Sequence, residues 1–171
     1  IYGKRPFGVS ILMVGYNGDK PRVFEINPEV WWKDVVASIN TLHKLDPFAF
    51  ASVQGLGLCG FTRTQVFLGP DGAVLRPAIT WQDTRAELTI PTLKALLPDT
   101  HPEFEQINAF HPLARLHWLK TAEPQTVQNL ATVLDPKDFI AYRLTGARHS
   151  DPISMARLLA ASQPGKDGRG L

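Results

Sequence analysis

The chain has 171 residues, 44% of them hydrophobic, which suits one domain with a buried core. Lysine and arginine (18) nearly balance aspartate and glutamate (16), and this mixed charge excludes a strongly basic nucleic-acid arm or an acidic tail. The longest apolar run, Val9–Val14, is far shorter than the roughly 20 residues of a membrane span, and the single cysteine, Cys59, allows no internal disulfide. We therefore expect a soluble, cytoplasmic protein with no nucleic-acid or membrane partner.

The first 27 residues predict a β-hairpin. Gly8–Tyr16 is apolar and β-branched, the Asn-Gly-Asp run at 17–19 is a strong turn signal, and Arg22–Ile26 alternates polar and apolar residues. A helix is expected next, because Asn27-Pro28-Glu29 combines an N-cap, a first-turn proline and an acid. Asp46-Pro47 is expected to end this helix.

Short apolar runs bounded by turn signals predict the remaining elements. We expect strands at Val53–Cys59 (buried), Gln65–Leu68, Ala73–Leu75, Ala78–Trp81 and Thr132–Leu134, and helices at Asp83–Leu97, Pro112–Thr121, Pro124–Leu130, Lys137–Leu144 and Ile153–Ala161. Gly69–Gly72 reads as a hairpin turn, and Gly146 as a helix C-cap. Strands alternating with helices predict an α/β fold with a mixed sheet, followed by a flexible tail at 162–171.

Motifs in chain order resemble the FGGY family of carbohydrate kinases, which includes xylulokinase, ribulokinase and glycerol kinase. The resemblance covers about residues 27–161. The matching motifs are Asn27-Pro28-Glu29-Val30-Trp31-Trp32, Gly55-Leu56-Gly57-Leu58-Cys59-Gly60, Leu75-Arg76-Pro77-Ala78-Ile79-Thr80-Trp81-Gln82-Asp83-Thr84-Arg85, Leu116-His117-Trp118-Leu119-Lys120 with Glu123-Pro124, Leu134-Asp135-Pro136-Lys137-Asp138-Phe139, Tyr142-Arg143-Leu144-Thr145-Gly146, and Ser150-Asp151 with Ser154-Met155-Ala156. The resemblance implies an actin-like or ribonuclease H-like mixed sheet flanked by helices, an incomplete N-terminal, sugar-binding domain at 28–161.

The resemblance also implies a pocket for a ketose or polyol. Thr62 and Arg63 stand where the family has its strand-end sugar-binding pair. Trp81 stands where the family has a tryptophan that contacts the substrate, and Phe110 and His111 fall near another sugar-contact position. The chemistry is coherent, because an indole offers an apolar face to sugar C–H groups, and Arg63 can donate to hydroxyls or pair with an acidic substituent.

Each of these residues also has an ordinary structural interpretation. Trp81 could belong to the core, and Asp83 with Arg85 could cap a helix instead of supporting the site, which is the interpretation we favour for Asp83. Cys59 is expected to be a small buried hydrophobe. The histidines have no metal-binding spacing, and no catalytic residue or metal ligand is assigned.

ATP and Mg²⁺ are the cofactors that the resemblance implies, but the residues that bind them are expected to be absent from this chain. Gly8-Val9-Ser10 is the only partial match to the family's phosphate-binding hairpin, and it has no acid before it. No Walker-type glycine-rich motif is present. The chain is therefore expected to hold part of the sugar-binding domain and to be inactive alone in γ-phosphoryl transfer from ATP to a sugar hydroxyl.

Residues 1–28 resemble a different family, the hairpin of 20S proteasome α subunits, through Tyr2–Leu12 and Pro21–Pro28. The two resemblances meet at Phe24–Glu29, so we hypothesise a junction of two unrelated sequences there. Three functions stay open: a part of a sugar kinase, a non-catalytic binding module on the same domain, and a proteasome-like structural subunit. An uncovered sheet edge would also favour a homo-oligomer.

Overall fold

The computed structural model describes residues 22–162, so the expected strand Gly8–Tyr16, its turn and most of the C-terminal tail lie outside the described residues. The last part of the expected hairpin is described, and its strand β1 covers Glu25–Ile26. The boundaries at residues 27/28 and 161/162 stay predictions.

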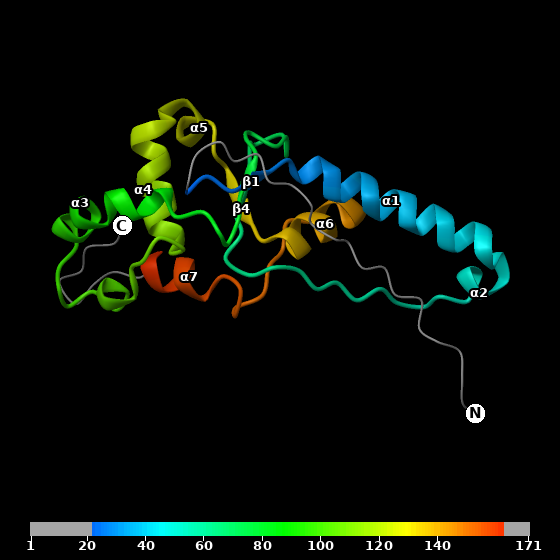
Figure 1. The fold of residues 1–171 in the computed structure, drawn as a ribbon. Coiled ribbons are helices and arrows are strands. Elements are labelled where there is room, and N and C mark those ends of the chain that lie inside the picture. Colours follow the sequence, from blue (N-terminus) through cyan, green and yellow to red (C-terminus); the bar gives the residue numbers. More distant parts are fainter. Residues whose placement is uncertain (1–21, 163–171) are drawn as a thin grey trace.

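Helix α1 (Pro28–Leu45) forms as its sequence predicts. The Asn27 side chain accepts a hydrogen bond from the Glu29 backbone N–H at 3.0 Å, which satisfies a donor that the first helical turn leaves free. Asp46 ends α1 and caps the short helix α2 (Pro47–Ala51), accepting from Ala49 N–H at 2.8 Å. Figure 1 shows α1 extending away from the strands with α2 at its far end.

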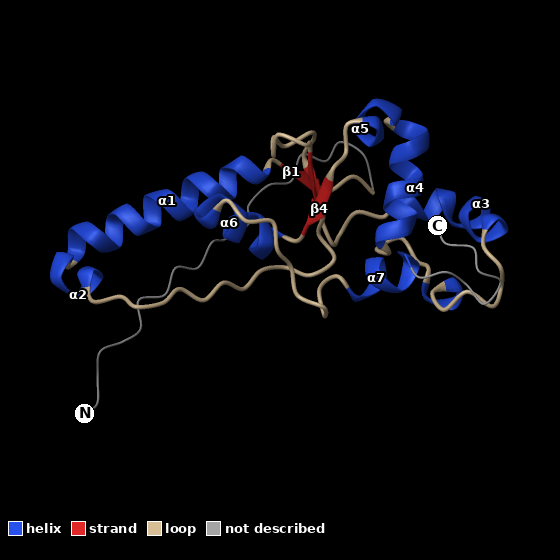
Figure 2. Cartoon of the chain, turned by 180° about the vertical axis from the view of Figure 1, so that it is seen from behind, coloured by secondary structure: helices blue, strands red, loops and turns tan. Residues whose placement is uncertain are grey.

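The strands are short and pair antiparallel. β1 pairs with β3 (Ala78–Ile79), and β2 (Val66–Leu68) pairs with β4 (Thr132–Leu134). Bridges between Gln65 and Ile79 and between Leu68 and Val74 connect the neighbouring segments, the second across the expected hairpin turn. Figure 2 shows the strands at the centre, with α1 and α6 on one side and α3, α4, α5 and α7 on the other. The strand pairs within residues 22–162 are antiparallel, in an α/β arrangement.

Proline and glycine residues determine where the helices in the second half of the chain begin and end. α4 (Pro112–Ala122), α5 (Pro124–Gln128) and α6 (Pro136–Thr145) each have proline in the first turn, where no N–H is needed. Gly146 ends α6 at φ +75°, and its N–H donates to Tyr142 C=O at 2.7 Å. This is the left-handed cap that the sequence predicts.

The core holds the strands between the two groups of helices. Trp31 of α1 and Phe139 and Ile140 of α6 pack on Val66, Leu68 and Leu134. On the other side, Leu119 of α4 packs with Phe67 and Ile79. A third cluster joins α4 to α3 (Ile90–Leu96) through Ala114, Ala86 and Leu93.

The expected buried strand at Val53–Cys59 is wrong. These residues are exposed and irregular, and a Cβ added at Gly55 or Gly57 would meet nothing within 4 Å. Cys59 is likewise exposed rather than buried. A strand needs a partner for its backbone groups, and within residues 22–162 this apolar run has none.

Two helices begin more than two residues away from the expected position. The expected helix Asp83–Leu97 is a 3₁₀ helix (Arg85–Thr89) followed by α3, because Pro91 has no N–H to donate to Glu87 C=O, which instead accepts from Ile90. Helix α7 covers Ala156–Ser162 instead of beginning at Ile153, because the Asp151 carboxylate accepts from the backbone N–H groups of Ile153 and Ser154 and holds a turn there.

Candidate functional site: a polar cleft at the strand ends

A cleft of about 280 Å³ opens where several strands meet at one end. Because β2 and β4 are antiparallel with Val66 opposite Leu134, Gln65 before β2 and Asp135 after β4 reach the same end. Both residues line the cleft. The other lining residues come from the turn before β2, the segment before α4, and the start of α7: Thr62, Arg63, Gln106, Asn108, Phe110, His111, Pro112, Ile153, Ser154, Met155, Arg157 and Leu158.

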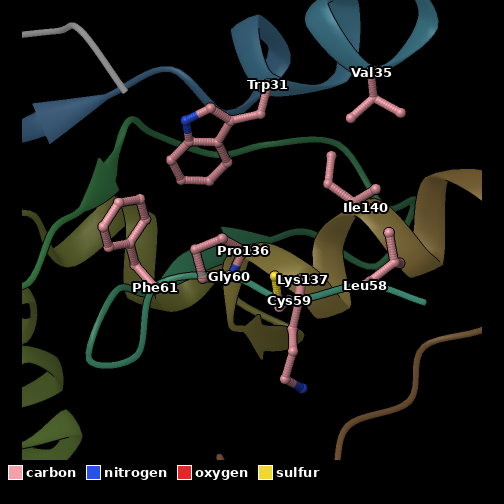
Figure 3. A pocket seen from close by; sticks show the side chains of 9 residues that line it. All are labelled: Trp31, Val35, Leu58, Cys59, Gly60, Phe61, Pro136, Lys137 and Ile140. Atoms are coloured by element: carbon pink, nitrogen blue, oxygen red, sulfur yellow. The ribbon is translucent and has the colours of Figure 1, made fainter. Parts of the chain in front are cut away.

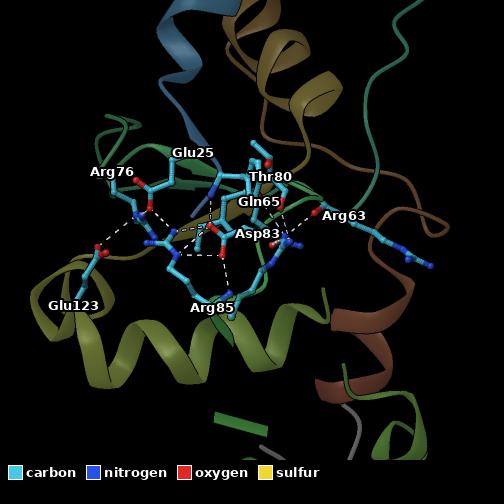
Figure 4. Close-up of polar contacts among 11 residues, drawn as sticks. Glu25, Arg63, Gln65, Arg76, Thr80, Asp83, Arg85 and Glu123 are labelled. Carbon is cyan, nitrogen blue, oxygen red and sulfur yellow. Dashed lines mark hydrogen bonds and ion pairs between the residues drawn. The ribbon is translucent and has the colours of Figure 1, made fainter. Parts of the chain in front are cut away.

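Arg63 has a backbone conformation that is unusual for a residue other than glycine. Its backbone lies in the left-handed region (φ +58°), which costs a non-glycine residue about 1–2 kcal/mol. Its guanidinium lies 6.0 Å from the centre of the Phe110 ring and is exposed. In Figure 4 the Arg63 side chain points away from the buried arginines and acids beside it. Four of the five predicted sugar-contact residues, Thr62, Arg63, Phe110 and His111, therefore line one cleft.

Arg115 of α4 fixes the floor of this region. It is 1% exposed, and its guanidinium donates to the carbonyls of Arg63 (2.6 Å) and Thr80 (2.6 Å) and to the side-chain oxygen of Gln65. Burial lowers the pKa of Arg115 to about 10, so it remains charged at neutral pH. One buried cation thus ties the turn before β2 to the end of β3.

His111 uses both ring nitrogens within the chain. Nδ1 accepts from Leu113 N–H at 3.2 Å as the N-cap of α4, so Nε2 carries the proton and donates to Glu103 at 2.9 Å. Burial lowers the pKa of His111 despite its bond to Glu103. Arg157 of α7 holds Glu103 from the other side at 3.0 Å. His111 therefore positions the wall of the cleft, with both nitrogens already engaged.

Asp135 differs from the other acids near the cleft. It is 5% exposed and is the N-cap of α6, yet its side chain makes no capping hydrogen bond. Burial, followed by the neighbouring Asp138 carboxylate, raises the pKa of Asp135 to about 7. Asp138, in contrast, accepts from Lys137 and Ser150, both at 2.6 Å. Asp135 was not singled out from the sequence, because the motif gave it no role and its isolation arises only on folding.

Trp81 lies beside the cleft but is not one of the residues that line it. It follows β3, its backbone N–H donates to Thr64 Oγ1 at 3.2 Å, and the residue is 46% exposed. The core interpretation of Trp81 is therefore wrong. Trp81 is exposed, and a role in sugar contact stays a prediction.

Asp83 and Arg85 belong to an ion-pair network with Glu25 and Arg76 (Figure 4). Asp83, 2% exposed, accepts from Phe24 N–H at 2.8 Å and from Arg85 N–H at 3.0 Å. Although burial opposes its charge, hydrogen bonds to Asp83 and Glu25 raise the pKa of Arg85. Glu25 also pairs with Arg76. The Asp83 carboxylate thus accepts from a backbone N–H at the start of the 3₁₀ helix, although the N-cap residue of that helix is Thr84, and it also attaches the residue before β1 to the core.

A second, smaller cavity of about 120 Å³ lies between α1, α6 and the segment 58–61. Figure 3 shows its lining, which includes the apolar Trp31, Ile140 and Phe61, with Cys59 near Lys137. Hydrophobic side chains dominate, so it lacks the convergent polar groups of a sugar site. The larger polar cleft is the candidate site.

Two further properties bear on the class of protein. No helix within residues 22–162 is long and apolar enough to cross a membrane. The same residues bring no group of three or more histidine, cysteine, aspartate or glutamate side chains together to hold a metal ion.

Comparison with known proteins defines the class. Residues 13–159 match the model of the N-terminal domain of the FGGY family of carbohydrate kinases, so the chain belongs to this family. The expected FGGY resemblance is confirmed. The match begins inside the segment 1–28, whose likeness to a proteasome hairpin stays a prediction.

The similar proteins include several xylulose kinases. The chain is 28% identical over 153 residues to the xylulose kinase of Staphylococcus xylosus, covering 86% of this chain and 31% of that protein. It is 31% identical over 130 residues to the xylulose kinase of Escherichia coli K12, covering 74% of this chain and 26% of that protein. The crystal structure of xylulose kinase from Rhodospirillum rubrum matches with a TM-score of 0.62 at 26% identity, covering 81% of this chain and 30% of that one. The chain spans less than a third of these relatives, and the expected fold, a partial FGGY N-terminal domain, is confirmed.

Proposed function

We propose that this chain supplies the sugar-binding part of an ATP-dependent carbohydrate kinase that acts on a ketose of the xylulose type. The observation that carries the proposal is the convergence of Thr62, Arg63 and Phe110 on one polar cleft. The xylulose kinases among its relatives support the choice of sugar. A cytoplasmic location, expected from composition, belongs to the same proposal.

The cleft residues suit a polyhydroxylated ligand. The Arg63 guanidinium and the Asn108 and Gln106 side chains can donate to hydroxyl oxygens, while the Phe110 face accommodates C–H groups. Trp81 offers a second aromatic face nearby. A site that combines a few fixed polar groups with apolar walls is typical of small-molecule binding.

Mg-ATP supplies the γ-phosphoryl group in such kinases. Among the described residues the acids around the cleft do not offer a set of ligands for Mg²⁺, because Lys137 engages Asp138 and Asp151, His111 and Arg157 engage Glu103, and Asp135 remains as a single carboxyl. We therefore derive no step through the nucleotide. This chain's own part in the reaction is to bind and orient the sugar.

A non-catalytic binding role on the same domain is the second candidate. Gly8-Val9-Ser10, which lacks the acid of the family's phosphate-binding hairpin, favours it. In this role the cleft would bind a sugar without phosphorylating it.

Calorimetric titration with D-xylulose, L-ribulose and glycerol, each with and without Mg-ATP, tests both candidates. We expect D-xylulose to bind and Arg63→Met and Trp81→Ala to weaken binding, while Lys33→Met, exposed on α1, leaves it unchanged. No binding of any of the three at millimolar concentration would overturn the proposal. Turnover of ATP by the chain would exclude the non-catalytic candidate.

A further inference from the structure

The Asp135 carboxyl is an acid that lines the cleft without a hydrogen-bond partner among the described residues. It is 5% exposed, borders a cavity of about 280 Å³, and forms no side-chain hydrogen bond among residues 22–162. Its oxygens are not among the fully enclosed side-chain atoms of the described residues that lack a partner, so they reach the cleft. A carboxyl that is mostly enclosed, borders a cavity and has no protein partner is a candidate for contact with a ligand.

The neighbours of Asp135 are satisfied by other groups. The side-chain oxygen of Gln65, which lies next to Asp135 across the strand pair, accepts a hydrogen bond from the Arg115 guanidinium. Ser154, on the opposite wall, donates to Asp151 at 2.7 Å. Asp138, three residues further along, is paired with Lys137 and Ser150. Asp135 is thus the cleft acid whose hydrogen-bonding capacity these contacts leave unused.

We infer that the Asp135 carboxylate accepts hydrogen bonds from sugar hydroxyls in the cleft and helps to determine which sugar binds. This inference rests on the proposed function, because it assigns a residue to the same site. Asp135 lies after β4, whereas the motif-based candidates lie before β2 and before α4. A ligand that bridges them would therefore contact both β2 and β4 at their shared end.

The pH dependence of binding gives a readout that a structural role would not move. With its pKa near 7, Asp135 changes from a carboxylic acid to a stronger acceptor between pH 6 and pH 8. Other charged groups on the elements around Asp135 and the cleft are Arg63, Glu103, His111, Arg115, Lys137, Asp138, Asp151 and Arg157. The Asp135→Asn variant retains all of these groups. The difference in pH dependence of binding between this variant and the parent chain therefore reports on Asp135.

D-xylulose binding is therefore measured at pH 6 and pH 8 for the full chain, Asp135→Asn and Asp99→Asn. Asp135 makes no capping bond, so asparagine of similar size is compatible with the fold, and Asp99 is an exposed acid that serves as control. We expect the parent chain and Asp99→Asn to bind several-fold more tightly at pH 8. We expect Asp135→Asn to bind about tenfold more weakly at pH 8 and to lose this pH dependence.

The experiment distinguishes a failure of the role given to Asp135 from a failure of the proposed function. If the parent chain binds D-xylulose and Asp135→Asn matches it at both pH values, the role of Asp135 is overturned while the proposed function stands. If the parent chain binds no D-xylulose, both are overturned. An Asp135→Asn chain that binds weakly but keeps the parental pH dependence would show that Asp135 acts through packing, and would also overturn the inference.

Discussion

The guanidinium of Arg115 donates to the carbonyl oxygen of Arg63 at 2.6 Å, and this contact holds Arg63 in a left-handed conformation at the edge of the cleft. The same guanidinium also bonds the Thr80 carbonyl at the end of β3. A residue from α4 therefore orders a turn 52 positions earlier in the chain. The candidate site depends on this buried cation even though Arg115 does not line it.

Replacement of Arg115 by methionine should lower the free energy of unfolding by about 3–5 kcal/mol, because it removes charge-assisted hydrogen bonds to the Arg63 and Thr80 carbonyls and to the Gln65 side chain, each worth about 1.5–3 kcal/mol. Lys120→Met, on the exposed face of the same helix, is the control and should change stability by less than about 0.5 kcal/mol. Urea denaturation followed by circular dichroism measures both. Equal stability of the two variants would contradict the role given to Arg115.

The Asp83 network makes a second prediction. Asp83→Asn should destabilise the fold by about 3–5 kcal/mol, since it breaks a buried pair with Arg85 and a bond to the Phe24 N–H. Glu29→Gln removes a half-exposed pair with Arg143 and should cost at most about 1 kcal/mol. If Asp83→Asn instead abolished sugar binding in a chain of unchanged stability, Asp83 would belong to the site.

Asp135 should make stability depend on pH. Its folded pKa of about 7 lies above the ordinary carboxyl value, so the folded chain holds a proton that the unfolded chain releases. This contribution is complete below about pH 4 and is lost as the pH rises through about 7. The difference in unfolding free energy between the parent chain and Asp135→Asn should therefore change across this window. A difference that is constant with pH would refute the raised pKa.

Alanine substitutions at two glycines with positive φ distinguish the cost of backbone strain from the cost of a steric clash. Gly146→Ala places a side chain at φ +75° in open space and should cost about 1 kcal/mol. Gly72→Ala, at φ +82°, places its Cβ against the Tyr142 hydroxyl and should cost more, because the ring must also move. Thermal denaturation of the two variants makes the comparison. An equal loss in both would mean that the turn at Gly72 can open away from Tyr142.

Thiol reactivity tests the corrected position of Cys59. An exposed thiol should react with an aromatic disulfide reagent in the folded chain about as fast as in denaturant. Cys59 is the single cysteine of the chain, so the signal has one source. Protection until unfolding would instead support the buried strand that the sequence predicts for Val53–Cys59.

Elements with a local cause were predictable. Asn27 with Pro28 starts α1, Pro112 begins α4, and Gly146 ends α6, because capping and proline geometry depend on a few neighbouring residues. The segment Val53–Cys59 was mispredicted because its burial depends on a distant partner strand. The helix predicted at Asp83–Leu97 did not take into account that Pro91 lacks an N–H, which separates the 3₁₀ helix from α3.

The sequence by itself determined the family, the main helices and four residues that line one cleft, because motifs and capping patterns are local and ordered along the chain. Only the tertiary structure decided which acids are free to meet a ligand. Asp83, Glu103, Asp135 and Asp138 are chemically alike in sequence, but folding pairs three of them with arginine, histidine or lysine and leaves Asp135 buried at the cleft. That distinction arises from strand register and helix packing, which bring together residues far apart in the chain.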